Sequence, residues 1–223
     1  MTRLMVEAHS DEKGTPLGKL RILAVVVLLL LAGDAWLRAT AEARVASELQ
    51  SSFDPDGETE IAFGGFPFAA RVISGTIPVA RLTSSSLIRS GVRLSDVKMT
   101  LQDVEFSWSK IIAGEVGSVT VRAGKGSASI GERGLNRALA AVADGVRVQI
   151  EDGFLRAFVG GRSARAELTI EDTDLVLGMG GTERTVTVPL PRFVAGLRYG
   201  SVELRALRVT ISFTLDEANF SNL

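Results

Sequence analysis

Along the chain, the spacing of hydrophobic residues changes twice, and each change predicts a different kind of element. Residues 22–32 read ILAVVVLLLLA and are apolar without interruption. In residues 34–50 the apolar positions recur every fourth residue, which is typical of an amphipathic helix. From residue 57 onward hydrophobic and polar residues alternate, as in residues 208–215, and this period of two predicts antiparallel strands with one buried and one solvated face.

The alternation slips in phase at several points in these predicted strands. Val92 and Leu94 share one phase, whereas Val97 and Met99 take the other, and a further slip falls at residues 204–207. Each slip requires a turn or a β-bulge, and a bulge bends a strand and increases its twist. The pattern therefore predicts roughly eight to eleven strands in one long, strongly curved antiparallel sheet.

A second helix is predicted inside the strand-rich part of the chain. Residues 129–132 fit the S-x-x-E capping box, Leu135, Leu139 and Val142 follow on one helical face, and Gly145 marks the end. The predicted fold class is therefore α+β: a long curved antiparallel β-sheet packed on one or two helices and preceded by an N-terminal membrane helix.

The uninterrupted apolar run predicts a segment that enters a membrane. Lys19 and Arg21 precede it, and at 1.5 Å per residue its eleven residues span about 16 Å, half of a bilayer core. A cleaved signal peptide, an uncleaved signal anchor and a buried core helix are the three interpretations. The run lacks the polar stripe of a core helix, and the A-x-A site at residues 39–41 lies far beyond it, so we favour the anchor.

This interpretation divides the chain into three parts. Residues 1–19 form a polar cytoplasmic tail, residues 20–37 a signal anchor or signal peptide, and residues 38–223 an extracytoplasmic domain. Because the basic flank stays inside, the expected location is the cell membrane, with a single pass and the domain on the periplasmic side.

Composition excludes most catalytic chemistry. The 223 residues include no cysteine, and the single histidine is His9 in the N-terminal tail. Thiol nucleophiles, histidine-containing triads and zinc sites built from histidine or cysteine are therefore excluded. A net charge of −1 provides no large basic face for nucleic acid. We predict no enzyme, no catalytic residue, no metal site and no cofactor.

Paired carboxylates leave one enzymatic alternative, a hydrolase acting on envelope glycans or lipids. Glu151-Asp152 and Glu171-Asp172, with Asp174 beyond, are the acidic pairs that glycoside hydrolysis could use. Both pairs border expected turns, where acidic residues are common, and their spacing matches no calcium-binding loop. We therefore interpret them as turn residues.

Aromatic residues gather in one short stretch, GGFPFAA, at residues 64–70. Phe63, Phe66 and Phe68 are three of the ten phenylalanines, and they fall within six residues. If this stretch begins a strand, Pro67 is tolerated there and Phe66 and Phe68 project to the same face.

Several segments together resemble the LmeA-type phospholipid-binding family of actinobacterial envelope proteins. The resemblance spans residues 20–215 and rests on AEARVASELQ, GGFPFAARVISGTIPVARLTSSSL, ERGLNRALAAV and VPLPRFVAGLRYGSVELRALRVTISF. The G-F-P-F motif is its most specific element. One departure is Ala206, where the family often has glycine before its last strand.

The resemblance implies a function that the periodicity does not. It implies non-enzymatic binding of anionic phospholipid, phosphatidylinositol-type lipids among them, in the periplasm, with a link to lipoglycan or envelope maintenance. It also implies a plan similar to tubular lipid-binding folds, in which a curved sheet wraps a helix around an apolar groove. A scaffold protein of an envelope complex, without a lipid ligand and with an unknown protein partner, is the alternative.

We predict that acyl chains enter an apolar groove between sheet and helices. The candidate lining residues are Phe63, Phe66, Phe68, Phe106, Trp108, Leu135 and Leu139, each of which could instead belong to an ordinary core. Arg71 and Arg81 are the candidates for the headgroup, because a guanidinium binds phosphate with two hydrogen bonds.

Overall fold

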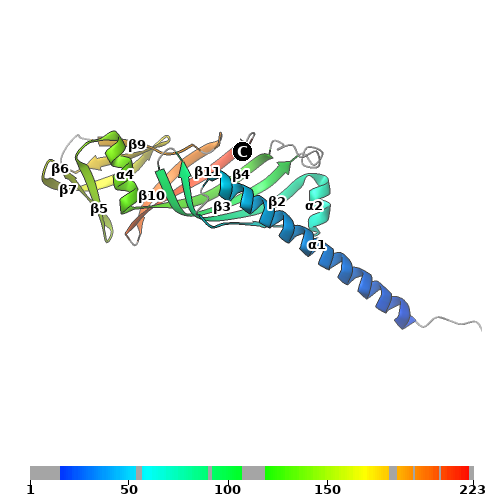
Figure 1. Cartoon of the computed structure of the whole chain (residues 1–223). Coiled ribbons are helices and arrows are strands. Elements are labelled where there is room, and N and C mark those ends of the chain that lie inside the picture. The colour runs from blue at the N-terminus through cyan, green and yellow to red at the C-terminus, as the bar shows by residue number, and fades with distance from the viewer. Residues whose placement is uncertain are drawn as a thin grey trace, which may run out of the picture.

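The structure is an elongated body of two antiparallel sheets, with one long helix that runs along the body and extends beyond it (Figure 1). It is a computed structural model, and it describes residues 16–53, 57–89, 92–106, 119–180, 185–192, 194–205 and 207–220.

The first sheet has six strands in the order β1-β2-β3-β4-β11-β10, all antiparallel. Its strands are β1 (Thr59–Phe63), β2 (Thr76–Arg89), β3 (Val92–Phe106), β4 (Val119–Gly131), β10 (Leu197–Arg205) and β11 (Arg208–Phe220). The phase slip predicted after Leu94 is confirmed, because the register between β3 and β4 shifts between Ser95 and Lys98. The slip predicted at residues 204–207 falls where β10 ends at Arg205 and β11 begins at Arg208, and Leu207 has a φ of 63° there.

The second sheet corrects the prediction of one long sheet. It is a meander of five strands in sequence order: β5 (Val146–Glu151), β6 (Phe154–Val159), β7 (Arg162–Glu171), β8 (Asp174–Met179) and β9 (Thr185–Pro189). The helix after β4 takes the chain away from the first sheet. Short turns join β5 to β6, β6 to β7 and β7 to β8, so each strand pairs with its neighbour in the sequence, and β5 and β9 are the two edges of the sheet.

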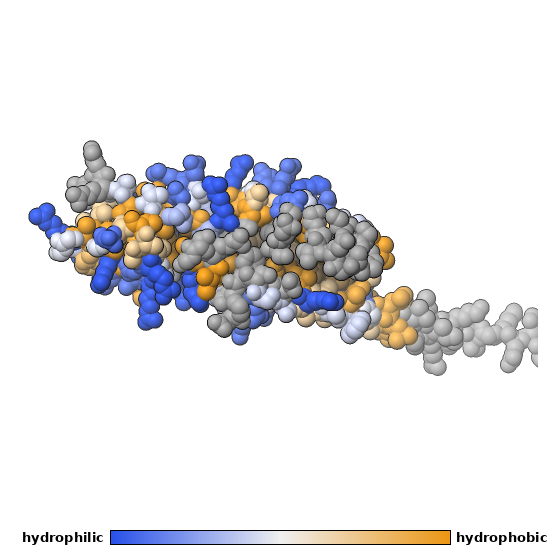
Figure 2. Space-filling model, turned by 45° about the horizontal axis from the view of Figure 1, so that its top comes forward, coloured by the Kyte–Doolittle hydropathy of each residue, from blue (hydrophilic) through white to orange (hydrophobic). Residues whose placement is uncertain are grey.

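Three helices accompany the sheets: α1 (Pro16–Phe53), α2 (Phe68–Ser74) and α4 (Glu132–Val142). The apolar run and the predicted amphipathic helix are both parts of α1. Among the described residues, no helix offers a stretch long and apolar enough to cross a membrane. In Figure 2, the part of α1 that emerges from the body is coloured orange, which marks hydrophobic residues.

Helix α2 was not predicted, and it replaces the expected start of a strand. Pro67 precedes it, and Gly75 ends it with a φ of 71° and a hydrogen bond from its N–H to the carbonyl of Val72. Its seven residues are too few to show a helical period in the sequence. As a result Phe66 and Phe68 do not share a face: Phe68 is 1% exposed and Phe66 is 63% exposed.

Helix α4 forms where the sequence predicts it, but without the capping box. Ser129 stays within β4 opposite Thr210, and the N-cap residue is Gly131, which offers no side chain. Glu132 instead accepts a hydrogen bond from the backbone N–H of Ile150 at 2.9 Å. The acid therefore binds the edge strand β5 rather than its own helix.

One continuous core runs through both sheets, and α1, α2 and α4 all pack against it. In the first sheet, Gly126 of β4 leaves room for the ring of Phe213 from β11; a Cβ at residue 126 would lie 2.6 Å from that ring. The β5 end of the core is closed by α4, whose Leu135 and Leu139 are buried. The other end is closed by α1 and α2.

Candidate functional site

Helix α1 is fastened to the body by charged side chains four residues apart. The two carboxylate oxygens of Asp34 accept hydrogen bonds from the backbone N–H groups of Phe68, at 2.9 Å, and Ala69, at 2.7 Å. These are the first two N–H groups of α2, which have no partner inside their own helix. Asp34 therefore caps α2 from the neighbouring helix.

Arg38 and Glu42 continue this row along α1. Arg38 donates a hydrogen bond from Nη2 to the carbonyl of Gly65 at 2.5 Å, and Glu42 Oε1 accepts one from the N–H of Phe63 at 2.7 Å. The spacing i, i+4, i+8 keeps Asp34, Arg38 and Glu42 on one face of the helix. That face thus binds the main chain of residues 63–69, which we call the clasp segment.

Aromatic packing reinforces the same junction. The rings of Phe63 and Phe68 stack with centroids 5.7 Å apart and an interplanar angle of 13°. The guanidinium carbon of Arg38 lies 5.6 Å from the centroid of Phe68, a cation–π geometry. Leu37 and Ala41 of α1 pack against the core beside them. The clasp segment is therefore the place where α1 meets the sheet.

The pKa of Asp34 is lowered by this arrangement. The hydrogen bond from Ala69 is the largest cause, followed by that from Phe68, and the positive charge of Arg38 adds to them, while partial burial acts in the opposite direction. Each donor stabilises the charged carboxylate over the neutral acid.

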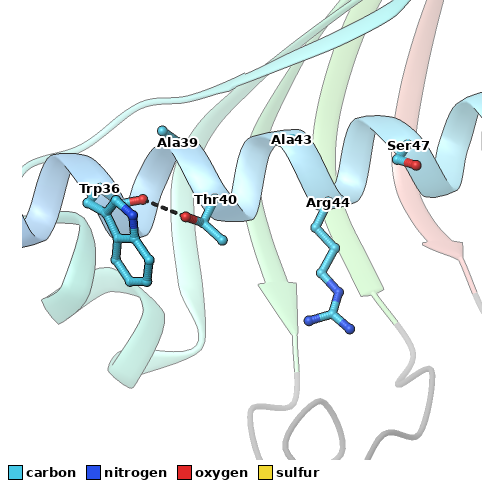
Figure 3. Close-up of a pocket in the computed structure, with 6 residues that line it drawn as sticks. All are labelled: Trp36, Ala39, Thr40, Ala43, Arg44 and Ser47. Carbon is cyan, nitrogen blue, oxygen red and sulfur yellow. Dashed lines mark hydrogen bonds between the residues drawn. The ribbon is translucent and has the colours of Figure 1, made fainter.

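The opposite face of α1 lines a broad concavity of about 790 Å³ (Figure 3). Its lining residues all come from α1: Trp36, Ala39, Thr40, Ala43, Arg44 and Ser47. Trp36 and Arg44 project from the helix toward the same side (Figure 3), and small side chains separate them. The hydroxyl of Thr40 donates to the carbonyl of Trp36 at 2.9 Å, which removes its need for another partner. The helix therefore provides one mostly apolar wall with a cation near one end.

A second concavity, of about 550 Å³, lies on the first sheet, and its lining is mostly apolar, with Leu82, Met99 and Phe213 among its residues. The strand register places Arg81, Thr100 and Lys125 in one cross-strand row, and Lys98 in the next row. None of the three cations forms an ion pair with a described residue. Lys98 of β3 lies opposite Thr83 of β2, which in turn lies opposite Glu60 of β1. The three cations, Arg81, Lys98 and Lys125, can attract a phosphate beside this apolar lining.

Some of the predicted groove residues lie together and others do not. Phe63 and Phe68 stack at the clasp segment. Phe106, half-buried at the end of β3, lies close by, because its N–H donates to the carbonyl of Gly75 at 2.9 Å. Phe66 belongs to the same region but points into solvent.

The remaining candidates are dispersed over the molecule. Leu135 and Leu139 are 1% and 0% exposed in the core under α4, which packs on β5 and β9. Arg71 is exposed on α2, whereas Arg81 is exposed on the polar face of β2, so these two do not form one headgroup site. Trp108 falls outside the described residues. Of the six described hydrophobic candidates, Leu135 and Leu139 therefore lie apart from the other four.

Asp34, Trp36, Arg38, Glu42 and Arg44 were not among the predicted site residues. The sequence contained one signal for the inward-facing charges: their period of four matches the helix, and no other charged residue shares that face between residues 34 and 42. The amphipathic pattern predicted for residues 34–50 places Arg38 and Glu42 on the more polar face of that helix. Local periodicity could not show that their partners are main-chain groups of another segment.

The carboxylates of the hydrolase alternative lie on hairpins of the second sheet. Glu151 forms an ion pair with Arg156 at 2.7 Å. Glu171 and Asp174 pair across the turn between β7 and β8, in which Asp172 has a φ of 54°. These acids therefore lie at strand ends and turns, as the sequence indicates.

The fold and the clasped helix describe a binding protein, in which α1 lies along a sheet beside an open, mostly apolar surface. Comparison with protein families identifies the class: the chain belongs to the LmeA-like phospholipid-binding family, whose model matches residues 32–221. It is a family of binding proteins with no known catalytic activity, and membership implies lipid binding. The resemblance found in the sequence is thus confirmed. No curated protein and no solved structure matches the chain.

Proposed function

We propose that this protein binds an anionic phospholipid at the surface of the cell membrane, on the extracytoplasmic side, and thereby supports the maintenance of the envelope or its lipoglycans. The observation that carries the proposal is the apolar wall that α1 presents in a chain of the LmeA-like phospholipid-binding family. The acyl chains pass along Ala39 and Ala43, and the phosphate meets Arg44.

The chemistry of the wall supports this arrangement. Small side chains let an acyl chain approach the helix closely, and every methylene removed from water contributes about 0.8 kcal/mol. The indole of Trp36, which is 71% exposed, offers an apolar plate at one end of the wall. A guanidinium forms paired hydrogen bonds with phosphate oxygens, which favours an anionic headgroup at Arg44. Arg71 and Arg81 stay predictions for further headgroup contacts.

We also propose that the N-terminal part of α1 anchors the protein in the membrane. Val27 to Leu31 are all exposed, and the basic residues Lys19 and Arg21 precede them, on the side expected to stay in the cytoplasm. Asp34 and Leu37 contact the body, so the anchor ends before Asp34. The bound lipid then lies close to the bilayer from which it comes.

Photo-crosslinking tests the lipid-binding proposal. The full chain is reconstituted in vesicles that contain phosphatidylinositol with a photoreactive acyl chain, illuminated, digested and analysed by mass spectrometry. We expect adducts on the peptides that contain residues 36–47 and fewer adducts with a phosphatidylcholine probe. Adducts confined to the residues before Asp34 would mean that only the anchor contacts lipid, and the proposal would then be wrong.

A pair of variants on α1 distinguishes lipid binding at the apolar wall from lipid binding elsewhere on the helix. Ala43→Glu places a charge on the wall, and Val45→Glu places the same charge on an exposed position of α1 outside it. Both variants retain the anchor, so both retain any lipid that surrounds it. We expect Ala43→Glu to lose most of the adducts on residues 36–47 and Val45→Glu to retain them.

A further inference from the structure

Exposed hydrophobic side chains gather at one end of the molecule. Among the described residues, thirteen large hydrophobic side chains are exposed, and eight of these lie on the start of α1, on Trp36 or around α2: Val27, Leu28, Leu29, Leu30, Leu31, Trp36, Phe66 and Ile73. Single exposed hydrophobic residues are ordinary on protein surfaces, but a contiguous group marks a contact.

Helix α2 has two apolar faces, although a helix at the edge of a domain needs only one. Phe68 and Val72 point into the core. Ala70 and Ile73 lie on the opposite side of the helix, Phe66 lies just before the helix begins, and all three are exposed. The exposed fractions of Phe66 and Ile73 are 63% and 77%. We call these three residues the outer face of α2.

The outer face of α2 adjoins the exposed start of α1. The bonds from Phe68 and Ala69 to Asp34 hold the beginning of α2 against α1. Leu31 precedes Asp34 by three residues, which is about 4.5 Å along the helix axis. Figure 2 shows hydrophobic surface on the emerging helix and on the neighbouring end of the body. The two apolar surfaces therefore lie at the same end of the molecule.

The exposure of α1 indicates what covers this surface. Five consecutive residues, Val27 to Leu31, surround the helix completely, because successive side chains are turned by about 100°. All five are exposed. A protein partner that covers one side would leave the other sides in water, whereas hydrocarbon covers every side at once. A tryptophan one turn further on is typical of a membrane–water interface, and exposed arginine, such as Arg71, favours anionic headgroups.

We propose that the outer face of α2 docks on the phospholipid bilayer in which α1 is anchored, as a second membrane contact. This inference rests on the proposed anchoring. Two contacts hold the domain in one orientation, whereas a single helix would let it swing. In that orientation Phe63, Phe68 and Phe106 lie near the headgroups, so that the clasp end of the domain faces the supply of lipid.

The absence of cysteine makes a direct test possible, because any introduced cysteine is unique. Ile73→Cys reports on the outer face of α2. Val142→Cys, at an exposed position on α4, is the matched control, and Leu29→Cys reports on the anchor. Each full-length variant is labelled with a polarity-sensitive fluorophore and reconstituted in vesicles of phosphatidylcholine and phosphatidylinositol with brominated acyl chains, which quench nearby labels.

We expect the labels at residues 73 and 29 to be quenched and blue-shifted, and the label at residue 142 to be unaffected. Quenching at residue 29 together with none at residue 73 overturns the docking of α2 but leaves the anchor intact. No quenching at residue 29 overturns the anchor, and residue 73 then decides the docking separately. Phe66→Cys repeats the measurement at a second position of the outer face, outside the helix, and the same pattern is expected there.

Discussion

Among the side chains of α1, Asp34 caps a helix to which it does not belong. Its carboxylate accepts hydrogen bonds from the first two N–H groups of α2, while Pro67, at the N-cap position of α2, makes no side-chain hydrogen bond there. A carboxylate at the N-terminus of a helix also interacts favourably with the partial positive charge at that end. One residue thus stabilises α2 and joins it to α1.

Replacing Asp34 with asparagine should weaken this junction in a pH-dependent way. The amide oxygen of Asp34→Asn can accept one of the two hydrogen bonds, but it carries no charge. Because the folded-state pKa of Asp34 is lowered from 3.8, its contribution to stability is present above pH 4 and is lost as the pH falls through the folded-state pKa. We expect a lower melting temperature for the variant at pH 7 and a difference that closes below pH 4.

Thermal unfolding of the full chain in detergent between pH 2.5 and 7, followed by circular dichroism, measures that difference. Asp152→Asn is the control, because it removes the same charge at an exposed turn between β5 and β6. A constant difference between the Asp34 variant and the wild-type protein across the whole range would contradict the proposed role of the charge.

At the scale of elements, helices protect the outer edges of two strands. Strand β1 ends the first sheet, and Glu42 of α1 accepts the N–H of Phe63 at that edge. Strand β5 ends the second sheet, and Asn136 of α4 binds both the N–H and the carbonyl of Val148, at 2.7 and 2.8 Å. An uncovered edge offers main-chain groups to other strands. In both places a polar side chain, rather than another strand, satisfies those groups.

The packing of β4 against β11 depends on a glycine. A Cβ at Gly126 would lie 2.5 Å from the carbonyl oxygen of Lys98 and 2.6 Å from the ring of Phe213. Gly126→Ala should therefore force the strands apart, and overpacking of this kind costs about 1–3 kcal/mol. We expect a lower free energy of unfolding, measured with urea.

Gly178→Ala provides the comparison for this glycine. Gly178 lies in β8, and nothing lies within 4 Å of the place that its Cβ would take. The alanine there restricts the unfolded chain and should leave the stability unchanged or raise it by up to about 1 kcal/mol. Equal losses in the two variants would show that the ring of Phe213 is not the cause.

At the scale of the whole molecule, a buried tyrosine connects the two sheets. Tyr199 of β10 belongs to the first sheet and donates a hydrogen bond from its hydroxyl to the carbonyl of Pro191, at 2.6 Å, in the chain that leaves the second sheet. Its ring meets that of Phe213 edge to face, with centroids 6.3 Å apart. Burial raises the pKa of Tyr199.

Tyr199→Phe retains the aromatic ring and removes the hydrogen bond from the hydroxyl to the carbonyl of Pro191. Leaving a buried carbonyl without its partner costs about 1–3 kcal/mol, so we expect a lower free energy of unfolding at pH 7. Since the folded-state pKa of Tyr199 is raised, its contribution is complete below the ordinary tyrosine pKa of about 10 and is lost as the pH rises beyond it. Urea unfolding at pH 7 and pH 11 should show that the difference between the two proteins shrinks, and a difference that grows would contradict this account.

Much of the fold could be predicted from local patterns. The alternation in β11, the apolar face of α4 and the slips at Leu94 and Leu207 reflect which side chains are buried. The order of hydrophobic and polar residues along the chain is enough to show this pattern. The G-F-P-F motif and the surrounding segments also identified the family. These features depend on residues close to one another in the chain.

The tertiary structure decided which elements meet. Two sheets rather than one follow from strand pairing, and pairing depends on turns and main-chain hydrogen bonds that the hydrophobic period does not record. For the same reason Leu135 and Leu139 are far from Phe63, although all three are apolar and share a core. The sequence by itself determined what must be buried. Only the folded chain, in which Asp34, Arg38 and Glu42 bind the clasp segment, decided that α1 turns its charges inward and leaves Trp36 and Arg44 facing outward.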